Sequence, residues 1–279
     1  MHTIRDQPLS SFAFSCLLPV YHRDDPDYLH DALLSIVENS LAPQRIIICE
    51  DGDIPSTLDT VIRAFQHFEL LRVKNTGSRG LHHNLNNALS FVETPWLCRC
   101  DADDINMPDR FEKQVNYLRL NHNIDVLGTD IIDFDPDGRT GRKSMPVTPE
   151  RVARWAGRRN PINHMTAFVR TEAIKACGGY PDVPFKEDYA LWLTMLARGY
   201  QLDNIPEVLV RARMGKNFHA RRAGWHNFRS EGAILKRKLS VPQISAADAI
   251  TFFAIRSIIL LGGASLTKGV YNAVLRQRI

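Results

Sequence analysis

The sequence lacks the features that would mark an exported or membrane-spanning protein. Its amino-terminal stretch has no basic segment followed by an apolar one, so no secretion signal is expected. No uninterrupted apolar run reaches the roughly 18 residues that a membrane-spanning helix needs. Internal repeats and low-complexity segments are also missing, which excludes solenoid and fibrous architectures. We therefore expect a cytoplasmic globular protein.

Cysteine is scarce, and its pattern favours buried thiols over a disulfide framework or a zinc site. The five cysteines are odd in number, form no C-x-x-C pair and lie in or beside apolar stretches. They are Cys16, Cys49, Cys98, Cys100 and Cys177. We interpret them as buried thiols in a reducing compartment.

Charge is unevenly distributed along the 279 residues, which are 44% hydrophobic and 24% charged. The segment from Arg211 to Ile279 holds thirteen Lys or Arg and two acids, a net charge of +11. The whole chain carries +4, so residues 1–210 carry −7. A basic segment meets nucleic acid, a membrane surface or an anionic substrate. We predict one large α/β domain over 1–215 and a basic helical tail over 216–279.

Strand and helix patterns alternate through the first hundred residues. Short apolar runs predict strands over 14–21, 45–51, 70–73 and 96–100. Helical spacing predicts helices over 27–39, 58–68 and 80–91. This alternation is typical of a parallel sheet with helices on both faces, and its ligands bind beyond the carboxyl ends of the strands. Those ends carry Pro19–Tyr21, Glu50-Asp51 and Asp101–Asp104.

The alternation loosens beyond residue 105. Further helices are predicted over 109–120, 148–157 and 187–198. Strands are predicted over 125–129 and 208–212, and the residues at 133–141 have the composition of a hairpin tip.

Three carboxylates lie within four residues in Asp101-Ala-Asp-Asp104, directly after a predicted buried strand. Their mutual repulsion must be relieved by water or by a cation. Oxygen ligands favour a hard ion such as Mg²⁺ or Mn²⁺, which can stabilise the charge of a departing diphosphate. The alternative is a solvated turn in which Asp104 is the N-cap of the next helix.

Five stretches in this order resemble glycosyltransferase family 2, whose catalytic domain has the GT-A fold. They are Leu18-Pro-Val-Tyr21; Glu50-Asp51-Gly52; Asn75–Gly80 with Asn84 and Asn87; Asp101–Asp104 with Pro108, Arg110 and Phe111; and Gly178-Gly-Tyr180 with Glu187–Trp192. The likeness spans 14–192, about two-thirds of the chain. It implies a Rossmann-like, mostly parallel sheet flanked by helices, a UDP-sugar donor and Mn²⁺ or Mg²⁺. Within the family it is strongest for bacterial enzymes of surface-polysaccharide assembly.

The resemblance also implies how the donor is held. Asp51 would accept the uracil N–H, with Pro19 and Tyr21 beside the base. Arg79 would lie near the diphosphate, where a permanent cation is useful. The alternatives are a capping or solvated Asp51 and a surface Arg79.

The acidic motifs receive separate roles from the same resemblance. Asp103 would ligate the metal. Asp101 would contact the ribose, or the metal site through a metal-bound water. Asp188 would be the general base, because inverting transfer needs a carboxylate that takes the proton of the acceptor hydroxyl opposite the leaving diphosphate. Glu187 would lie beside it at the sugar nucleotide. The alternative for this pair is two helix N-terminal acids stabilised by the helix dipole.

Two loops carry weaker candidates. His164, in Asn160–His164, would contact the donor or acceptor sugar, and a satisfied structural histidine is the alternative. His219, Arg221 and Arg222 fall where related enzymes have a late loop that closes on the diphosphate, but the motif is not a clean match.

The apolar stretch at 247–261 is interrupted by Arg256 and followed by Gly262-Gly263. With Lys268, Arg276 and Arg278 it predicts a helix that lies on a membrane surface. A helix docked on the core, or one that forms a dimer contact, is the alternative. Nucleic acid is not expected, because the basic residues are not interleaved with stacking aromatics.

We therefore expect an inverting, metal-dependent enzyme at the inner face of the cell membrane. It would move a hexose (galactose, glucose or an N-acetyl form) from UDP to a polyprenyl-diphosphate-linked saccharide of O-antigen or exopolysaccharide. A nucleotidyltransferase is the first alternative, disfavoured because Tyr21–Pro26 lacks its glycine- and basic-rich signature. A non-catalytic membrane- or nucleic-acid-binding protein is the second. The oligomeric state is left open.

Overall fold

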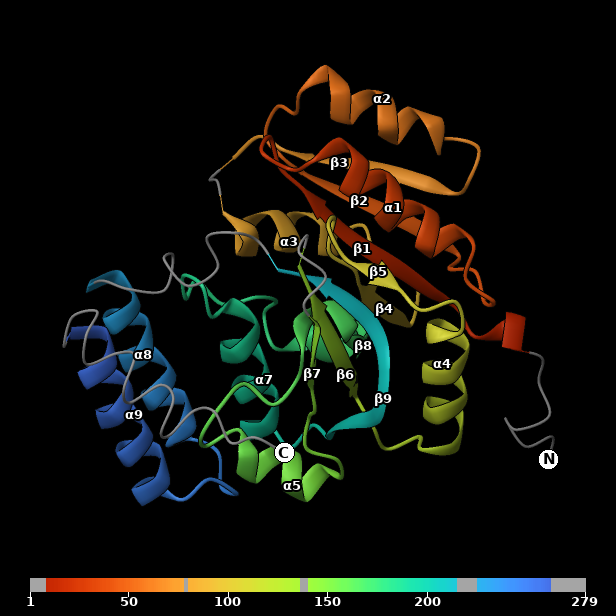
Figure 1. Cartoon of the computed structure of the whole chain (residues 1–279). Helices are drawn as coiled ribbons and strands as arrows, with labels where there is room; N and C mark the ends of the chain where they lie inside the picture. The colour runs from red at the N-terminus through yellow and green to blue at the C-terminus, as the bar shows by residue number, and fades with distance from the viewer. Residues whose placement is uncertain (1–8, 78–79, 136–139, 215–224, 262–279) are drawn as a thin grey trace.

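In the computed structural model, which describes residues 9–77, 80–135, 140–214 and 225–261, one mixed sheet organises the chain (Figure 1). Its strands are β1 (Phe14–Val20), β2 (Arg45–Asp51), β3 (Leu70–Asn75), β4 (Trp96–Arg99), β5 (Ile105–Asn106), β6 (Val126–Phe134), β7 (Thr140–Lys143), β8 (Phe168–Arg170) and β9 (Leu202–Arg213). The order across the sheet is β3-β2-β1-β4-β8-β6-β9-β5, and β7 pairs with β6.

Helices cover both faces of this sheet. They are α1 (Pro26–Val37), α2 (Ser56–Ala64), α3 (Leu81–Leu89), α4 (Arg110–Leu120), α5 (Pro149–Trp155), α6 (Thr171–Ala176), α7 (Glu187–Ala197), α8 (Trp225–Lys238) and α9 (Ala246–Leu261), with the 3-10 turns η2 (Leu9–Ser11) and η3 (His164–Thr166). Every helix and strand predicted over residues 14–120 is present, with ends that differ by a few residues.

The first four strands run parallel, as the alternating pattern predicted. Cys16 of β1 pairs with Ile46 of β2 on one side and with Cys98 of β4 on the other. The run Ile46–Ile48 is buried on both sides of the sheet, which is typical of a central parallel strand. Their carboxyl ends therefore meet at one edge of the sheet.

The second half of the sheet mixes directions. The short strand β8 runs antiparallel to both β4 and β6, while β6 and β9 are parallel. The hairpin of β6 and β7 matches the predicted turn, although its tip at 136–139 lies outside the described residues. Strand β9 begins at Leu202 rather than 208, because Leu202–Ile205 continue the pairing with β6.

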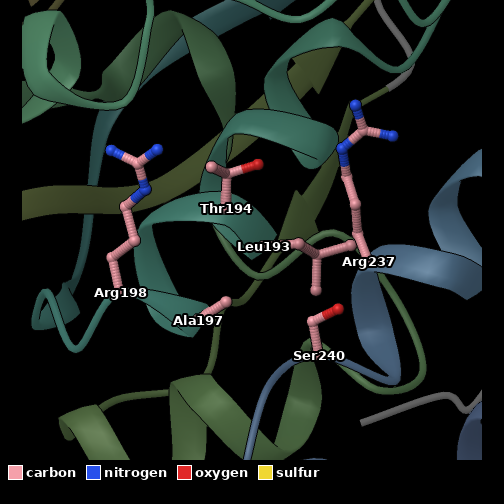
Figure 2. Close-up of a pocket in the computed structure, with 6 residues that line it drawn as sticks. All are labelled: Leu193, Thr194, Ala197, Arg198, Arg237 and Ser240. Carbon is pink, nitrogen blue, oxygen red and sulfur yellow. The ribbon is translucent and has the colours of Figure 1, made fainter.

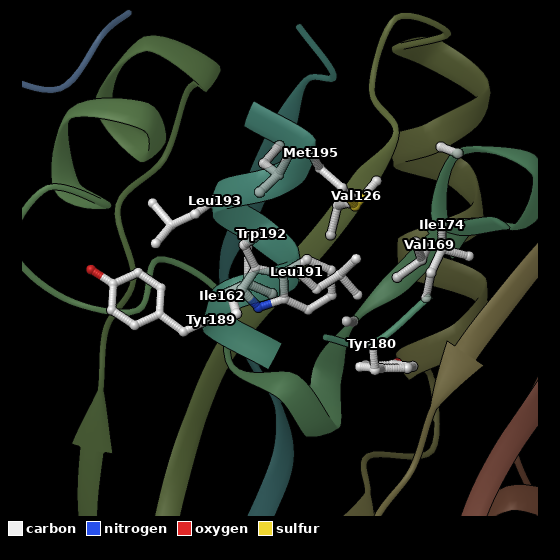
Figure 3. Close-up of a cluster of buried hydrophobic side chains, with 14 of the residues drawn as sticks. Val126, Ile162, Val169, Ile174, Tyr180, Tyr189, Leu191, Trp192, Leu193 and Met195 are labelled. Atoms are coloured by element: carbon white, nitrogen blue, oxygen red, sulfur yellow. The ribbon is translucent and has the colours of Figure 1, made fainter. Parts of the chain in front are cut away.

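Alternate residues of the strands face two separate hydrophobic clusters. Leu17 points to the cluster formed with α3, α6 and α7, whereas Cys16 and Leu18 point to the cluster formed with α1, α2 and α4. Helix α7 is apolar almost all round and lies deep in the first cluster, where Trp192 is fully buried (Figure 3). This packing fixes where the two acids at the start of α7 lie.

Helices α8 and α9 pack as a pair beside α7 (Figure 1). Ile234 of α8 and Ala249 of α9 are buried in the same cluster as α7. The described part of the tail thus fits the alternative of a docked helix, and the boundary at 215/216 stays a prediction. None of the helices in the described ranges is long and apolar enough to cross a membrane.

Candidate active site

The acidic motif lies at the carboxyl end of β4, where the parallel topology predicted it. The carboxylate oxygens of Asp101, Asp103 and Asp104 lie within 4.8 Å of one another. Asp103 is exposed, whereas Asp104 is buried and accepts a hydrogen bond from the Arg213 N–H at 2.8 Å through Oδ1. The other oxygen of Asp104 has no hydrogen-bond partner among the described residues. The turn is therefore more than a solvated helix cap.

The electrostatics of this cluster fit a bound cation. Loss of hydration and then repulsion from Asp101 raise the pKa of Asp103 to about 6, and burial with repulsion from both neighbours raises the pKa of Asp104 well above its usual value. A divalent ion would relieve that repulsion. Clustered carboxylate oxygens with an unsatisfied member are a donor set that suits Mg²⁺ or Mn²⁺.

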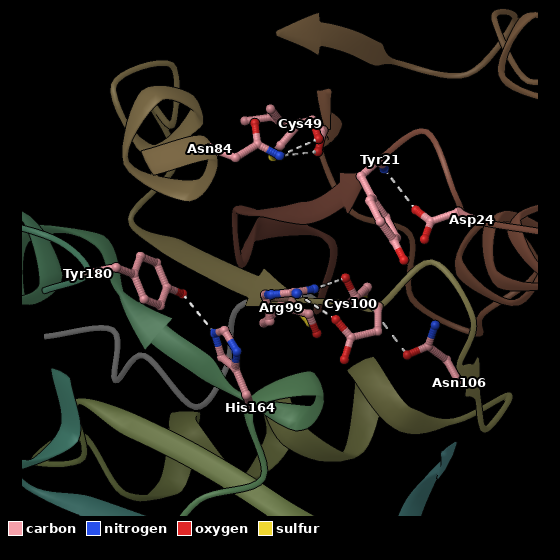
Figure 4. A network of polar contacts seen from close by, with 12 residues as sticks. Tyr21, Asp24, Cys49, Asn84, Arg99, Cys100, Asn106, His164 and Tyr180 are labelled. Atoms are coloured by element: carbon pink, nitrogen blue, oxygen red, sulfur yellow. Dashed lines mark hydrogen bonds and ion pairs between the residues drawn. The ribbon is translucent and has the colours of Figure 1, made fainter. Parts of the chain in front are cut away.

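A fourth carboxylate, which the sequence analysis did not single out, faces the cluster. Asp24 accepts a hydrogen bond from the Tyr21 N–H at 2.9 Å, which folds the turn after β1 toward the acidic motif (Figure 4). Burial raises the pKa of Asp24 to about 7, and the charges of Asp103 and Asp101 add to the effect. The neighbouring acid, Asp25, is the N-cap of α1.

Arg99 is the cation at the centre of this site, and sequence reasoning missed it too. Its side chain is 2% exposed, and its guanidinium lies 2.5 Å from the Asp101 carboxylate. It also donates to the Cys100 carbonyl (Figure 4). The charge of Arg99 lowers the pKa values of Asp24, Asp103, Asp104 and Glu187 against the effect of burial. Arg99 thus keeps several crowded carboxylates closer to ionisation.

Arg213, at the end of β9, closes another side of the cluster. Its Nε donates to the Asp103 carbonyl at 3.1 Å, and its guanidinium lies 3.7 Å from the centre of the Tyr28 ring. Arg213 therefore ties β9 to the acidic turn and to α1. The segment that follows, with the predicted His219, Arg221 and Arg222, lies outside the described residues.

The residues predicted to contact the uracil ring lie along the same edge of the sheet. Pro19 and Tyr21 are partly exposed at the end of β1. Asp51, at the end of β2, accepts hydrogen bonds from the Gly80 N–H at 3.3 Å and from Asn75 at 3.4 Å. Both contacts are long, so the carboxylate retains acceptor capacity while it holds the loop between β3 and α3. Arg79 falls in the part of that loop that the structure does not describe.

The acidic pair at the start of α7 faces the same site. Asp188 accepts hydrogen bonds from Asn160 Nδ2 at 2.6 Å and from the Tyr189 N–H at 2.7 Å, so its carboxylate is held in place. Glu187 is buried, and burial with repulsion from Asp188 raises its pKa to about 7. The charge of Asp101 contributes to that rise, which places Glu187 within electrostatic range of Asp101.

His164 contacts Tyr180 rather than an open position. Its Nε2 lies 3.2 Å from the Tyr180 hydroxyl (Figure 4). Burial and then the Arg99 charge lower the pKa of His164 well below its usual value, so the ring is neutral. These contacts fit the alternative of a satisfied structural histidine, and a role toward the sugar stays a prediction.

The Gly178-Gly-Tyr180 turn has a packing reason for its glycines. Asn86 of α3 donates to the Tyr180 carbonyl at 2.8 Å and accepts from the Tyr180 N–H at 2.7 Å. A Cβ on Gly179 would lie 2.2 Å from the Asn86 Oδ1, and Gly179 has a φ of +78°. The turn therefore locks Tyr180 to α3.

A shallow pocket lies elsewhere, between α7 and α8 (Figure 2). It is lined by Leu193, Thr194, Ala197, Arg198, Arg237 and Ser240. Its α7 residues come from the second half of that helix, Arg237 comes from the end of α8 and Ser240 from just after it, whereas the acidic pair lies at the beginning of α7. The pocket is not part of the carboxylate site.

Comparison with known proteins agrees with this arrangement. The family model described as Glycosyl transferase family 2 matches residues 15–179. The UDP-Gal:alpha-D-GlcNAc-diphosphoundecaprenol beta-1,3-galactosyltransferase of Escherichia coli is 32% identical, covering 95% of this chain and 97% of its own. The amylovoran biosynthesis glycosyltransferase AmsE of Erwinia amylovora is 29% identical, covering 93% and 98%.

Solved structures share the fold at low identity. S. aureus TarS 1-349 in complex with UDP-GlcNAc has a TM-score of 0.70 at 18% identity, covering 94% of this chain and 79% of its own. Mannosyltransferase PcManGT from Pyrobaculum calidifontis, in complex with GDP-Man and Mn²⁺, has a TM-score of 0.60 at 16% identity, covering 98% and 86%. The predicted GT-A fold is confirmed. With the family match over more than half of its length, the chain belongs to glycosyltransferase family 2.

Proposed function

We propose that this glycosyltransferase is a metal-dependent, inverting enzyme that transfers a hexose from a UDP-sugar to a polyprenyl-diphosphate-linked saccharide. The observation that carries the proposal is the presence of two clusters of carboxylates, one in the turn after β4 and one at the start of α7. The Asp101–Asp104 turn would supply the cation site, and Asp188 would supply the base next to Glu187, whose pKa is raised in part by the Asp101 charge.

Asp103 and Asp101 would hold Mn²⁺ or Mg²⁺, which when bound neutralises charge on the donor diphosphate and on the departing UDP. The Arg99 guanidinium lies 2.5 Å from the Asp101 carboxylate and fixes its orientation. Asp24 adds a fourth carboxylate beside the cation site. Pro19, Tyr21 and Asp51 line the strand ends where the uracil ring would lie.

Asp188 would act as the general base. The acceptor hydroxyl oxygen attacks the anomeric carbon on the face opposite the diphosphate, the bond from that carbon to the UDP oxygen breaks, and the hydroxyl proton passes to the Asp188 carboxylate. Asn160 and the Tyr189 N–H hold that carboxylate, and its pKa is raised above the ordinary value chiefly by burial. A base with a raised pKa binds the proton more strongly during transfer.

The acceptor class rests on two supports. One is the printed activity of the Escherichia coli relative, whose acceptor is a diphosphoundecaprenol-linked sugar. The other is the +11 charge of residues 211–279, which favours an anionic membrane surface. We propose that the enzyme works at the inner face of the cell membrane.

The nucleotidyltransferase alternative and the non-catalytic alternative are now less favoured. The family match and the intact acidic cluster both support glycosyl transfer.

The test is transfer from a panel of UDP-hexoses and UDP-N-acetylhexosamines to a polyprenyl-diphosphate-linked saccharide in Mn²⁺. The product is then examined by NMR for its anomeric configuration. We expect one donor to dominate and the new bond to have the opposite configuration to the donor. A product that retains the donor configuration, or turnover that is unaffected by a chelator, would contradict the proposal.

A further inference from the structure

A buried carboxylate of α8 joins the C-terminal helical pair to the residue that precedes the α7 acids. Glu231 is 3% exposed, and its Oε1 lies 2.9 Å from Lys186 Nζ. Arg256 of α9 pairs with the same oxygen. Burial disfavours the ionised form of this carboxylate. The Arg256 and Lys186 cations outweigh that effect and hold the pKa of Glu231 below its usual value. The three charges therefore form an ionised cluster between α7, α8 and α9.

The backbone that Lys186 belongs to is strained. Phe185, just before it, has a φ of +64° although it carries a side chain, and that side chain is 63% exposed. A non-glycine residue in this region costs about 1–3 kcal/mol and persists only where neighbouring contacts hold it. The exposed Phe185 side chain provides little of that hold, whereas the Lys186 ion pair is buried directly beside it.

A second contact from α8 meets α7 on the other side of the acids. The Lys238 ammonium lies 5.5 Å from the centre of the Tyr189 ring, and the Tyr189 hydroxyl donates to the Ala156 carbonyl at 2.5 Å. Lys186 and Tyr189 flank Glu187 and Asp188 directly. Helix α8 thus contacts the chain immediately before and immediately after the acidic pair.

Hydrophobic packing alone would be a sufficient reason for α8 to dock. Ile234 already provides it, and a buried ion pair contributes little net stability compared with apolar residues of the same size. A buried charge cluster that adds little stability but fixes one geometry is better explained by positioning.

We infer that Glu231 is a positioning residue for the transfer reaction: through Lys186 it holds the start of α7 so that Asp188 meets the acceptor hydroxyl. This inference rests on the proposed function of Asp188. It also gives the C-terminal helices a role in the chemistry that does not depend on membrane binding.

The test compares three single variants of the full chain, and the double variant of Glu231 and Lys186, with wild type at a temperature well below unfolding. Glu231→Gln and Lys186→Met each remove the pair that reaches α7. Arg256→Gln is the matched control, because it removes the other cation of Glu231 and leaves the Lys186 contact intact. The measurements are kcat, the acceptor KM, UDP affinity by calorimetry and the melting temperature.

We expect Glu231→Gln and Lys186→Met each to lower kcat about 10-fold with unchanged UDP affinity, because small displacements of a base are costly. The double variant should lose no more than either single one, since both remove the same contact. Arg256→Gln should keep kcat within about 2-fold while its melting temperature falls. Lys186→Met retains the Glu231–Arg256 pair, so it tests the same point if Glu231→Gln does not fold.

Wild-type kcat in both Glu231→Gln and Lys186→Met would overturn the inference, as would equal losses of kcat in all three variants. Failure of the proposed function gives a different result, since wild type itself would then show no transfer with any UDP-sugar.

Discussion

The Arg99 guanidinium lies 2.5 Å from the Asp101 carboxylate and is 2% exposed. The Arg99 charge lowers the pKa values of Asp24 and Glu187, whose burial and crowded negative charges would otherwise favour protonation. A permanently charged side chain is suited to this position, because an arginine does not lose its proton when it is buried.

The first prediction concerns this arginine. Arg99→Gln should lower transfer at least 10-fold and raise the Mn²⁺ concentration needed for half-maximal rate, because Asp101 loses its partner. It should also destabilise the fold by about 1–3 kcal/mol, the cost of leaving polar groups unsatisfied. Arg99→Lys keeps the charge and should recover part of the metal dependence. Equal Mn²⁺ requirements in wild type and Arg99→Gln would disprove this role.

A second prediction concerns the metal site. Asp103→Asn should abolish the stabilisation that Mn²⁺ gives wild type, which is about 2.7 kcal/mol at a concentration 100 times Kd. Asp109→Asn is the control, since Asp109 is a nearby acid that pairs with Lys113 on the surface. Thermal unfolding with and without Mn²⁺ measures both. If Asp103→Asn responds to Mn²⁺ as wild type does, Asp103 is not a metal ligand.

The acidic pair of α7 predicts the pH dependence. A general base acts only when ionised, and the pKa values of Glu187 (to about 7) and Asp188 are raised. Transfer should therefore decline at a higher pH than an ordinary aspartate would give, because burial raises the pKa of Asp188. Glu187→Gln removes a neighbouring negative charge, lowers the pKa of Asp188 and should move this decline to lower pH. A profile of kcat/KM that does not move in Glu187→Gln would show that the two acids are not coupled.

The two adjacent glycines before Tyr180 allow a matched stability test. Gly178→Ala and Gly179→Ala both place a side chain at positive φ, which costs about 1–2 kcal/mol. Only Gly179→Ala also displaces Asn86 and its two hydrogen bonds to Tyr180, for roughly 2 kcal/mol more. Chemical denaturation of the two variants gives the difference. Equal losses would mean that Asn86 moves aside without cost.

Membrane binding by the tail is the last prediction. The wild type should sediment with anionic vesicles more than with neutral ones, and salt should weaken this binding. Replacing Lys268, Arg276 and Arg278 with Gln should weaken binding to anionic vesicles by about 1 kcal/mol for each residue replaced. Arg151→Gln with Arg154→Gln, which removes exposed cations of α5, is the control. Binding that is the same on neutral vesicles would argue against an electrostatic tail.

The sequence alone predicted the parallel half of the sheet and the place of the acidic turn. Those features depend on local patterns, such as the β-branched run at Ile46–Ile48 and the acids after a buried strand. The three-residue strand β8 was missed because so short a run has no detectable period. The start of β9 was missed because Asp203 and Asn204 are polar residues of low strand propensity, and pairing with β6 holds them in the strand.

The partners of the site residues were not predictable from the sequence in the same way. Arg99 belongs to a predicted buried strand, and only the fold shows that its charge meets Asp101. Glu231 and Lys186 lie 45 positions apart, and no sequence period links them. Asp24 was hidden in a segment that also supplies a helix cap. Such contacts depend on tertiary packing, which local pattern does not record.

The most direct test of the central claim compares wild type with Asp188→Asn in Mn²⁺, measuring UDP affinity by calorimetry and hexose transfer on the same preparations. If Asp188 is the base of a metal-dependent transferase, the variant binds UDP as wild type does and loses transfer by at least 100-fold, roughly the lower end of what a general base contributes. Transfer by Asp188→Asn at a rate close to wild type would contradict the account.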